Sequence, residues 1–432
     1  MSLSVVSRNH RRFFLGAPGL ASLIGMGCAF GKSRLLNASR AAVLPPELAR
    51  SPWLAQVWND LDPADVWDAH VHLAGIGDSE SGIRLGDAMN APLRHPWQYL
   101  QRLFYMNGSG AGATRAARGV SVDEAYILRL TECMDALPLG VKSMVLAFDH
   151  FHDDTGQPRP EHSAFYIPDA YALALAQARP DRFVWASSIH PYRADAIDRL
   201  QQAAAQGAQA VKWLPAAQNM DPASPKCAAF FAELARLDLP LLIHCGKEAA
   251  VEGSNRQALG NPLRTRRALE AGVRVLIAHC ASQGSDEDLD HPGQQRASFD
   301  LFCRLMDDAE WQGRLFGDIS AIFLIHHPAR ATQTLLERAD WHARLINGSD
   351  YPLPGIIPVI STGRLVRAGL LPAEAAADLV ALRHHNPIFF DLALKRALRW
   401  QNRGFSPQVF ATRAFFTKEK HHARTETATE SA

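Results

Sequence analysis

The stretch Val66-Trp-Asp-Ala-His70-Val-His72-Leu73 is an apolar, strand-like run that carries two histidines separated by one residue. Side chains of a β-strand alternate between its two faces, so His70 and His72 are expected on the same side, with Val71 on the other. Two imidazoles on one face can form half of a metal site. Other parts of the sequence are needed to distinguish a metal site from two ordinary half-buried histidines.

Seven further apolar runs follow this stretch, and segments with helical spacing separate them. The runs span 143–148, 183–189, 210–214, 241–245, 273–279, 315–320 and 345–350. Buried strands that alternate with helices are typical of a parallel sheet covered by helices. Eight repeats predict an α/β fold of the closed (β/α)8 TIM barrel type. An open doubly wound sheet is the alternative, but no glycine-rich phosphate loop follows any of the strands.

The barrel is expected to occupy residues 61–402, after a linker and an N-terminal helix at 33–60. Residues 75–119 are rich in Gly, Arg and aromatic side chains, and we interpret them as a long loop inserted after the first strand, either a lid or a solvated insertion. Extra helices are expected at 372–383 and 387–400. Residues 403–432 are predicted to be a flexible tail.

A helix is also expected from 121 to 137, directly after the insertion. Ser121 is its predicted N-cap, and Glu124 would complete a capping box.

Residues 1–32 differ from the rest of the chain. Arg11-Arg12-Phe-Phe-Leu15 precedes a modestly apolar run through Phe30 without any acidic residue, which resembles a twin-arginine export signal and implies a periplasmic protein. A lipid anchor on Cys28, which would make a membrane-anchored lipoprotein, is the alternative. The match to a lipoprotein cleavage box is loose because Gly25 stands where leucine is expected.

The composition points to a small-molecule substrate. The chain has 432 residues, a formal net charge of +1 and 47% hydrophobic residues, and it has no Lys-Arg block beyond the N-terminus. These features argue against nucleic acid as a partner, and against membrane contact other than through the signal or anchor. A homo-oligomer is compatible with them. The five cysteines after Cys28 are scattered without a C-x-x-C motif, so we expect buried thiols.

Polar residues interrupt several predicted strands at their carboxyl ends, where a TIM barrel carries its catalytic groups. His70 and His72 end the first strand, His244 the fifth, His279 the sixth and Asp350 the eighth. One buried histidine is usually structural, but three strands that end in histidine and a fourth that ends in aspartate predict a functional site.

Two further residues are candidates for this pocket: Lys212 within the fourth strand and His190 at the end of the third. By contrast, His326-His327 lies near a helix start and is interpreted as a surface or capping pair.

The ordered motifs resemble the amidohydrolase superfamily and, within it, the amidohydrolase-2 branch. The resemblance rests on Asp68-Ala-His70-Val-His72, Val211-Lys-Trp-Leu-Pro215, Leu239-Pro-Leu-Leu-Ile-His-Cys-Gly246, Val275-Leu-Ile-Ala-His279, Gly348-Ser-Asp350 and Asn386-Pro-Ile-Phe-Phe390.

This resemblance implies that His70, His72, His244 and Asp350 hold one divalent metal, with zinc as the first candidate. Metal-bound hydroxide would be the nucleophile, and His279 and Asp350 would be catalytic through proton transfer. Lys212 has two implied roles: it would bind substrate or, when carboxylated, bridge a second metal.

The leading functional hypothesis is a metal-dependent hydrolase of an amide, ester or lactone, which are C–N or C–O bonds of a small molecule. The alternative is a metal-dependent, non-oxidative decarboxylase of an aromatic or unsaturated carboxylic acid, because the same branch uses the same ligands for both. A non-catalytic metal-binding barrel is disfavoured because every position of the metal set is filled.

Overall fold

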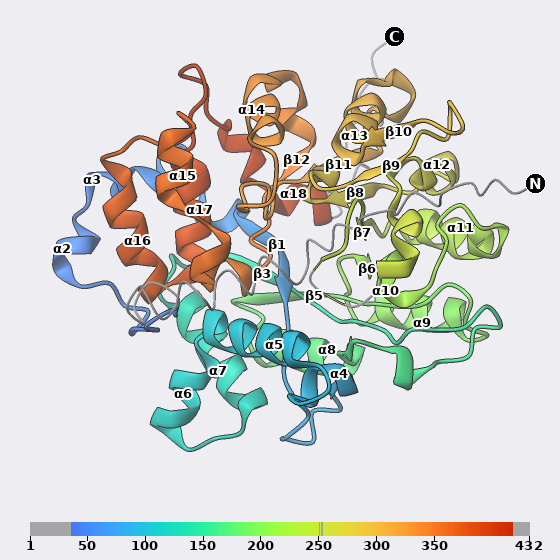
Figure 1. The fold of residues 1–432 in the computed structure, drawn as a ribbon, viewed down its shortest axis with the longest axis horizontal. Coiled ribbons are helices and arrows are strands. Elements are labelled where there is room, and N and C mark those ends of the chain that lie inside the picture. The colour runs from blue at the N-terminus through green and yellow to red at the C-terminus, as the bar shows by residue number, and fades with distance from the viewer. Residues whose placement is uncertain (1–35, 250, 252–253, 418–432) are drawn as a thin grey trace, which may run out of the picture.

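The computed structural model describes residues 36–249, 251 and 254–417. Its centre is a ring of parallel strands (Figure 1), which pair in two ladders, β1-β3-β5 and β6-β7-β8-β11-β12. The strands are β1 (Trp67–His72), β3 (Lys142–Leu146), β5 (Phe183–Ala186), β6 (Val211–Trp213), β7 (Leu241–His244), β8 (Val275–Ala278), β11 (Leu315–Asp318) and β12 (Leu345–Ile346). Each strand lies within one of the eight apolar runs predicted from the sequence, except that β3 begins one residue before its run, at Lys142.

Two short contacts close the ladders into one barrel. Ser187, after β5, pairs in parallel with Val211 of β6. Val71 of β1 pairs in parallel with Tyr351, after β12, and the amide of His72 donates to the carbonyl oxygen of Tyr351 at 3.0 Å. The first and last strands therefore meet, and the predicted (β/α)8 TIM barrel is confirmed.

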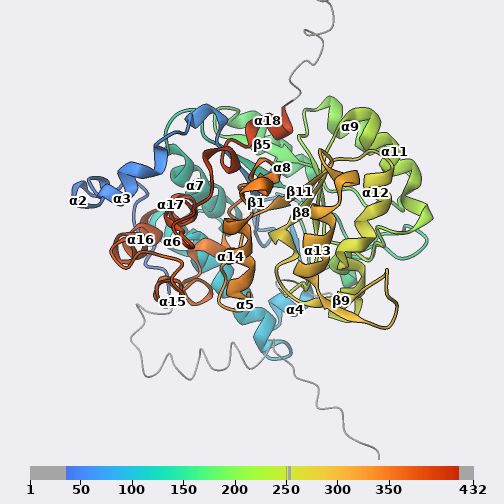
Figure 2. The ribbon, with the colours of Figure 1, turned by 90° about the horizontal axis from the view of Figure 1, so that it is seen from above.

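Helices cover the outside of the barrel because their apolar sides pack on the strands in one large core. In Figure 2, α9, α11 and α12 lie on one flank, with α16 and α17 on the other. The covering helices are α8 (Asp169–Ala178), α9 (Ala196–Ala205), α11 (Ala228–Leu237), α12 (Arg266–Glu270), α13 (Ser298–Asp307), α14 (Ala329–Glu337), α15 (Thr362–Arg367), α16 (Ala375–His385) and α17 (Pro387–Ala397). Among the described residues, the short helices α2 (Pro46–Ala49) and α3 (Pro52–Ala55) precede β1.

The insertion after β1 is mostly helical, so the interpretation of residues 75–119 as a long loop was wrong. It forms α4 (Asp87–Asn90), α5 (Pro96–Ser109) and α6 (Ala111–Arg118). Pro96 starts α5, and Gly110 ends it in the left-handed conformation. A Cβ on Gly355 would lie 1.9 Å from the carbonyl oxygen of Gly108, so the end of α5 packs backbone to backbone on the loop after β12.

The helix predicted at 121–137 is α7 (Val122–Asp135), and the capping box of Ser121 and Glu124 is confirmed.

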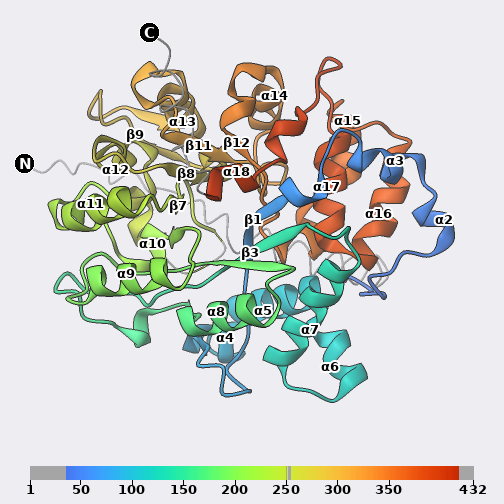
Figure 3. The same cartoon turned by 180° about the vertical axis from the view of Figure 1, so that it is seen from behind.

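The tail was predicted to be flexible from residue 403, yet it is packed as far as residue 417. Its last helix, α18 (Arg413–Phe416), lies beside the strands (Figure 3), and the Phe416 ring stacks on Trp67 with centroids 6.3 Å apart. Aromatic burial therefore seals the end of the barrel at which β1 begins.

Arg11, Arg12 and Cys28, with the rest of 1–35, lie outside the described residues, so the export signal stays a prediction. Within the part of the chain that the structure describes, no helix has the length and apolar character required to cross a bilayer.

A buried ion pair joins α17 to the turn after β12. Lys395 Nζ lies 2.5 Å from Asp391 Oδ2 and 3.3 Å from Asn347 Oδ1, and it also donates to the carbonyl oxygen of Gly348. Both side chains of the pair are almost completely buried. Burial raises the pKa of Asp391 to about 7, although Lys395 opposes this shift.

We predict that Lys395→Met destabilises the protein, because the buried Asp391 carboxyl group would lose its cation and would have to stay ionised without a partner or take up a proton. The expected loss in free energy of unfolding is about 3–5 kcal/mol, measured by urea denaturation. The double variant Asp391→Leu/Lys395→Met should recover most of the loss, since neither charge remains. A double variant as unstable as Lys395→Met would contradict this explanation.

Candidate metal centre and active site

Three of the predicted site residues meet at the carboxyl end of the barrel. The Nε2 atoms of His70 and His72 are 3.1 Å apart. Asp350 Oδ1 lies 3.2 Å from His72 Nε2 and 3.6 Å from His70 Nε2. These three residues form a group whose potential ligand atoms all lie within 4.8 Å of one another. The first and eighth strands thus bring their polar ends together.

The backbone around Gly348 allows this close approach. A Cβ at Gly348 would lie 2.7 Å from the Cβ of His70 and 2.9 Å from Asp318 Oδ1, so only glycine fits there. Two residues later the amide of Asp350 donates to the carbonyl oxygen of His70 at 2.8 Å. Asp350 has a left-handed backbone with φ of 58°, which is uncommon for a non-glycine residue.

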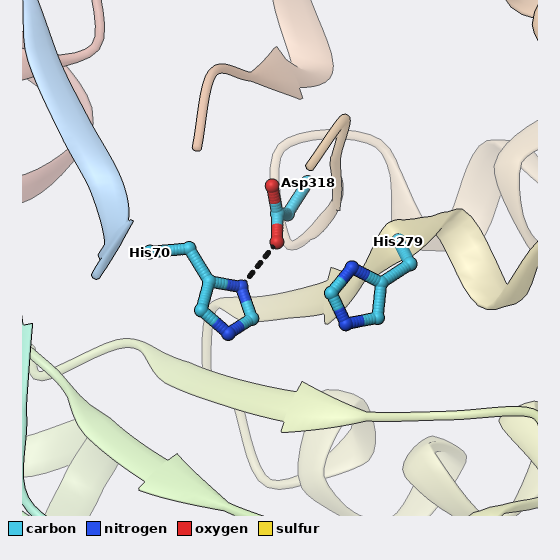
Figure 4. Close-up of side chains that lie close together, drawn as sticks. All are labelled: His70, His279 and Asp318. Carbon is cyan, nitrogen blue, oxygen red and sulfur yellow. Dashed lines mark hydrogen bonds and ion pairs between the residues drawn. The ribbon is translucent and has the colours of Figure 1, made fainter. Parts of the chain in front are cut away.

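Asp318, at the end of β11, orients the ring of His70 (Figure 4). Its Oδ2 lies 2.7 Å from His70 Nδ1 and accepts the hydroxyl of Ser320 at 2.6 Å, while its Oδ1 accepts the Ser320 amide at 2.7 Å. Three donors keep Asp318 ionised: its pKa is held well below the usual range, against the effect of burial, chiefly by His70. His70 therefore carries its proton on Nδ1 and presents the Nε2 lone pair to the site.

Ser320 also determines the tautomer of His279. The Ser320 hydroxyl group donates its hydrogen bond to Asp318. The Ser320 hydroxyl oxygen therefore accepts a hydrogen bond from His279 Nδ1, 2.8 Å away. His279 Nε2 is consequently an acceptor in the neutral ring, and it lies 3.8 Å from Asp350 Oδ2. His279 begins the short turn η8 (His279–Ala281) with a left-handed φ of 55°.

His244 stands further from the other predicted ligands. Among the described residues it belongs to no group of ligand atoms within 4.8 Å of one another. Its ring is edge-on to that of His279, with centroids 5.2 Å apart. Its Nε2 is buried, forms no hydrogen bond with the described residues, and lies 3.4 Å from Glu248 Oε2. A buried nitrogen without a hydrogen-bond partner is a candidate metal ligand.

The two additional candidates lie at different places in the barrel. Lys212 is fully buried, and its Nζ is 3.1 Å from His70 Nε2, so it reaches the centre of the site. His190 is also buried, but its contacts are with His152, whose ring stacks 4.5 Å from its own, and with the amide of Tyr192.

Burial sets the protonation states that a metal site requires. Burial lowers the pKa of His70 to about 3, assisted by Lys212, and that of His244 to about 4. The pKa of Asp350 is held far below its usual range by the neighbouring His279 and His70, although burial opposes this. Neutral imidazoles beside an ionised carboxylate are the donor states that bind a divalent cation.

Sequence reasoning missed Asp318, Ser320 and His327. Asp318 and Ser320 lie in the predicted run 315–320, and each interrupts apolar residues as His244 and His279 do, so the same rule would have found them. His327 was expected to be a surface or capping residue, and this was wrong: the structure buries it, with 6% of the residue exposed, and Pro328 is the N-cap of the helix that follows.

Comparisons with known proteins give one family and a set of distant folds. A sequence-family model described as amidohydrolase matches residues 67–388. Similar solved structures include an uncharacterised TIM-barrel protein from Bordetella bronchiseptica, 15% identical, with a TM-score of 0.43 over 74% of this chain and 99% of that one. A probable 2-pyrone-4,6-dicarboxylic acid hydrolase from Acinetobacter baumannii is 13% identical, with a TM-score of 0.41. The match covers 71% of this chain and 91% of that one.

The 5-carboxyvanillate decarboxylase from Sphingomonas paucimobilis is 11% identical, with a TM-score of 0.39 over 74% of this chain and 95% of that chain. A search of curated protein sequences gives no match.

We predict that Asp318→Asn weakens metal binding, because the ring of His70 loses the carboxylate that fixes its orientation and tautomer. Loss of such a partner typically lowers metal affinity about 10–100-fold. Competition with a chromogenic chelator measures the effect. Asp300→Asn, on the exposed side of α13, is the matched control and should bind metal as the wild type does. Unchanged affinity in Asp318→Asn would contradict its orienting role.

Proposed function

Because the chain belongs to the amidohydrolase family, and so is an enzyme of that superfamily, we propose that it is a metal-dependent hydrolase of an amide, ester or lactone. The observation that most supports this is the position of the Asp350 carboxylate. One of its oxygens lies 3.2 Å from His72 Nε2 and the other 3.8 Å from His279 Nε2. Such a carboxylate can share in cation binding and also accept a proton from water.

The residues present fit a divalent metal. The distance of 3.1 Å between the Nε2 atoms of His70 and His72 is close to the roughly 3.3 Å between two ligands of a tetrahedral zinc ion. His244 adds a buried nitrogen without a hydrogen bond to the described residues. His70, His72 and Asp350, whose ligand atoms lie within 4.8 Å of one another, would hold the metal, with zinc as first candidate; His244, the fourth proposed ligand, would have to move closer to join them. The metal would supply Lewis acidity and lower the pKa of a water molecule to about 7.

Lys212 bears on the number of metals. Burial lowers its pKa to about 8, against the attraction of Asp350 and Asp318, so a fraction of the amine is neutral near neutral pH. As an ammonium group it would donate to His70 Nε2, which a metal ligand has to keep free. We propose one metal, with Lys212 turned toward a substrate oxygen; a carboxylated Lys212 with two metals is the alternative.

Two side chains of the protein, Asp350 and His279, carry out the proton transfers. Asp350 takes the proton of the attacking water, since its low pKa keeps it ionised. His279 Nε2, an acceptor fixed by the hydrogen bond of Nδ1, can receive a proton and deliver it to the leaving group.

Metal analysis combined with a substrate screen tests this proposal. Elemental analysis should find about one divalent metal per chain, and the loaded enzyme should release acid from a lactone, an ester or an amide. Two metals per chain would favour the carboxylated Lys212. Release of carbon dioxide from aromatic carboxylic acids without hydrolysis of any probe would refute the hydrolase and establish a decarboxylase.

Two substitutions separate metal binding from proton transfer. His72→Ala should lose the metal, because it removes a ligand. His279→Asn should keep the metal but lose activity by at least about 100-fold, because it removes the proton acceptor. His291→Ala, at an exposed site, is the control for both. Metal retained by His72→Ala, or lost by His279→Asn, would show that the roles are wrongly assigned.

A further inference from the structure

A buried serine–histidine pair lies beside the site and is used by none of the steps above. Ser282, after η8, and His327, in the loop after β11, are both buried, and Ser282 Oγ lies 2.7 Å from His327 Nδ1. Because both residues follow barrel strands at their carboxyl ends, they are on the active-site side. The amide of Ser282 also donates to the carbonyl oxygen of His279 at 2.9 Å, so the pair is attached to the turn that carries His279.

The loop that carries His327 is held in place. The guanidinium group of Arg364 donates to the carbonyl oxygen of His327 at 3.1 Å and to that of Leu324 at 3.3 Å. The amide of Ile325 donates to the carbonyl oxygen of Val359 at 2.9 Å. These bonds fix the backbone from Leu324 to His327, so the position of the ring is built into the fold.

The hydrogen bond between Ser282 and His327 determines the tautomer of His327. The buried Ser282 hydroxyl has one hydrogen-bond partner among the described residues, His327 Nδ1, and a buried hydroxyl proton needs an acceptor. Ser282 therefore donates, Nδ1 accepts, and the ring proton is on Nε2. The Nε2 atom of His327 has no hydrogen-bond partner among the described residues. Unlike the Nε2 atom of His244, it is not fully buried, so it can reach a ligand.

His279 has the opposite arrangement. Its Nδ1 donates to Ser320, so its Nε2 is an acceptor, whereas Ser282 makes Nε2 of His327 a donor. Two serines thus set two nearby imidazoles to complementary states. A neutral imidazole N–H can polarise a carbonyl group without transferring its proton.

We propose that His327 is a further catalytic residue, which donates a hydrogen bond from Nε2 to the carbonyl or carboxylate oxygen of the substrate, and that Ser282 is its positioning residue. This inference rests on the proposed function, since it names a contact to that substrate. It assigns the donor to His327 and the acceptor to His279. Charge that develops on the substrate oxygen would then be stabilised by a group that needs no reorganisation.

Four variants of the metal-loaded enzyme test the proposal, with dihydrocoumarin as the lactone probe and salicylate as the carboxylic acid probe. His327→Ala should lower kcat about 100-fold at unchanged metal content, because an oxyanion donor is lost. His327→Gln keeps an N–H near the position of Nε2 and should recover most of the activity. Ser282→Ala should lower kcat by about tenfold. His326→Gln, the exposed neighbour, should retain the wild-type rate.

Nitrogen-15 NMR of labelled histidine provides a readout without turnover. Wild-type His327 should be the Nε2–H tautomer, and Ser282→Ala should shift it toward a mixture. A wild-type Nδ1–H tautomer, a rate for His327→Ala within twofold of wild type, or a His327→Gln variant as slow as His327→Ala would each overturn the inference. Loaded wild-type enzyme that turns over no lactone, ester, amide or carboxylic acid would instead refute the proposed function, and the tautomer would still be decided by NMR.

Discussion

The hydrogen bonds between β1 and the turn after β12 are the constraint on which the site depends. The amide of Ala69 donates to the carbonyl oxygen of Asn347 at 3.0 Å, and the amide of Asp350 donates to that of His70 at 2.8 Å. The same bonds close the barrel and set the Asp350 carboxylate beside the two imidazoles of β1. Lys395 supports this turn from α17 through Asn347. Barrel closure and site assembly are therefore one event.

Around this seam, small hydroxyl and carboxylate groups decide what each imidazole can do. Asp318 accepts the hydrogen bond of His70 Nδ1, and Ser320 links that carboxylate to His279. Each ring then offers one defined nitrogen to the mouth of the barrel. In a buried site this assignment matters more than the number of histidines, because a ring in the wrong tautomer presents a proton where a lone pair is needed.

The barrel could be predicted from the sequence because its strands are apolar runs that end in polar residues, and the meeting of His72 with Asp350 follows from barrel closure. Other features depend on packing between distant segments. The insertion is helical because Pro96 and Gly110 bound α5, although its Gly- and Arg-rich composition suggested a loop. His327 is buried because Arg364 holds its loop, a contact that no local pattern contains.

The seam between the first and last strands also has a consequence for biosynthesis. Asp68 accepts a hydrogen bond from the amide of Ser349, 281 residues later in the chain. A ribosome-bound chain presents His70 and His72 long before Asp350 emerges, and a product truncated before Asp350 would lack one member of the proposed ligand set. Occupancy of the proposed metal site would therefore require a chain that has been synthesised at least through Asp350 and has closed its barrel.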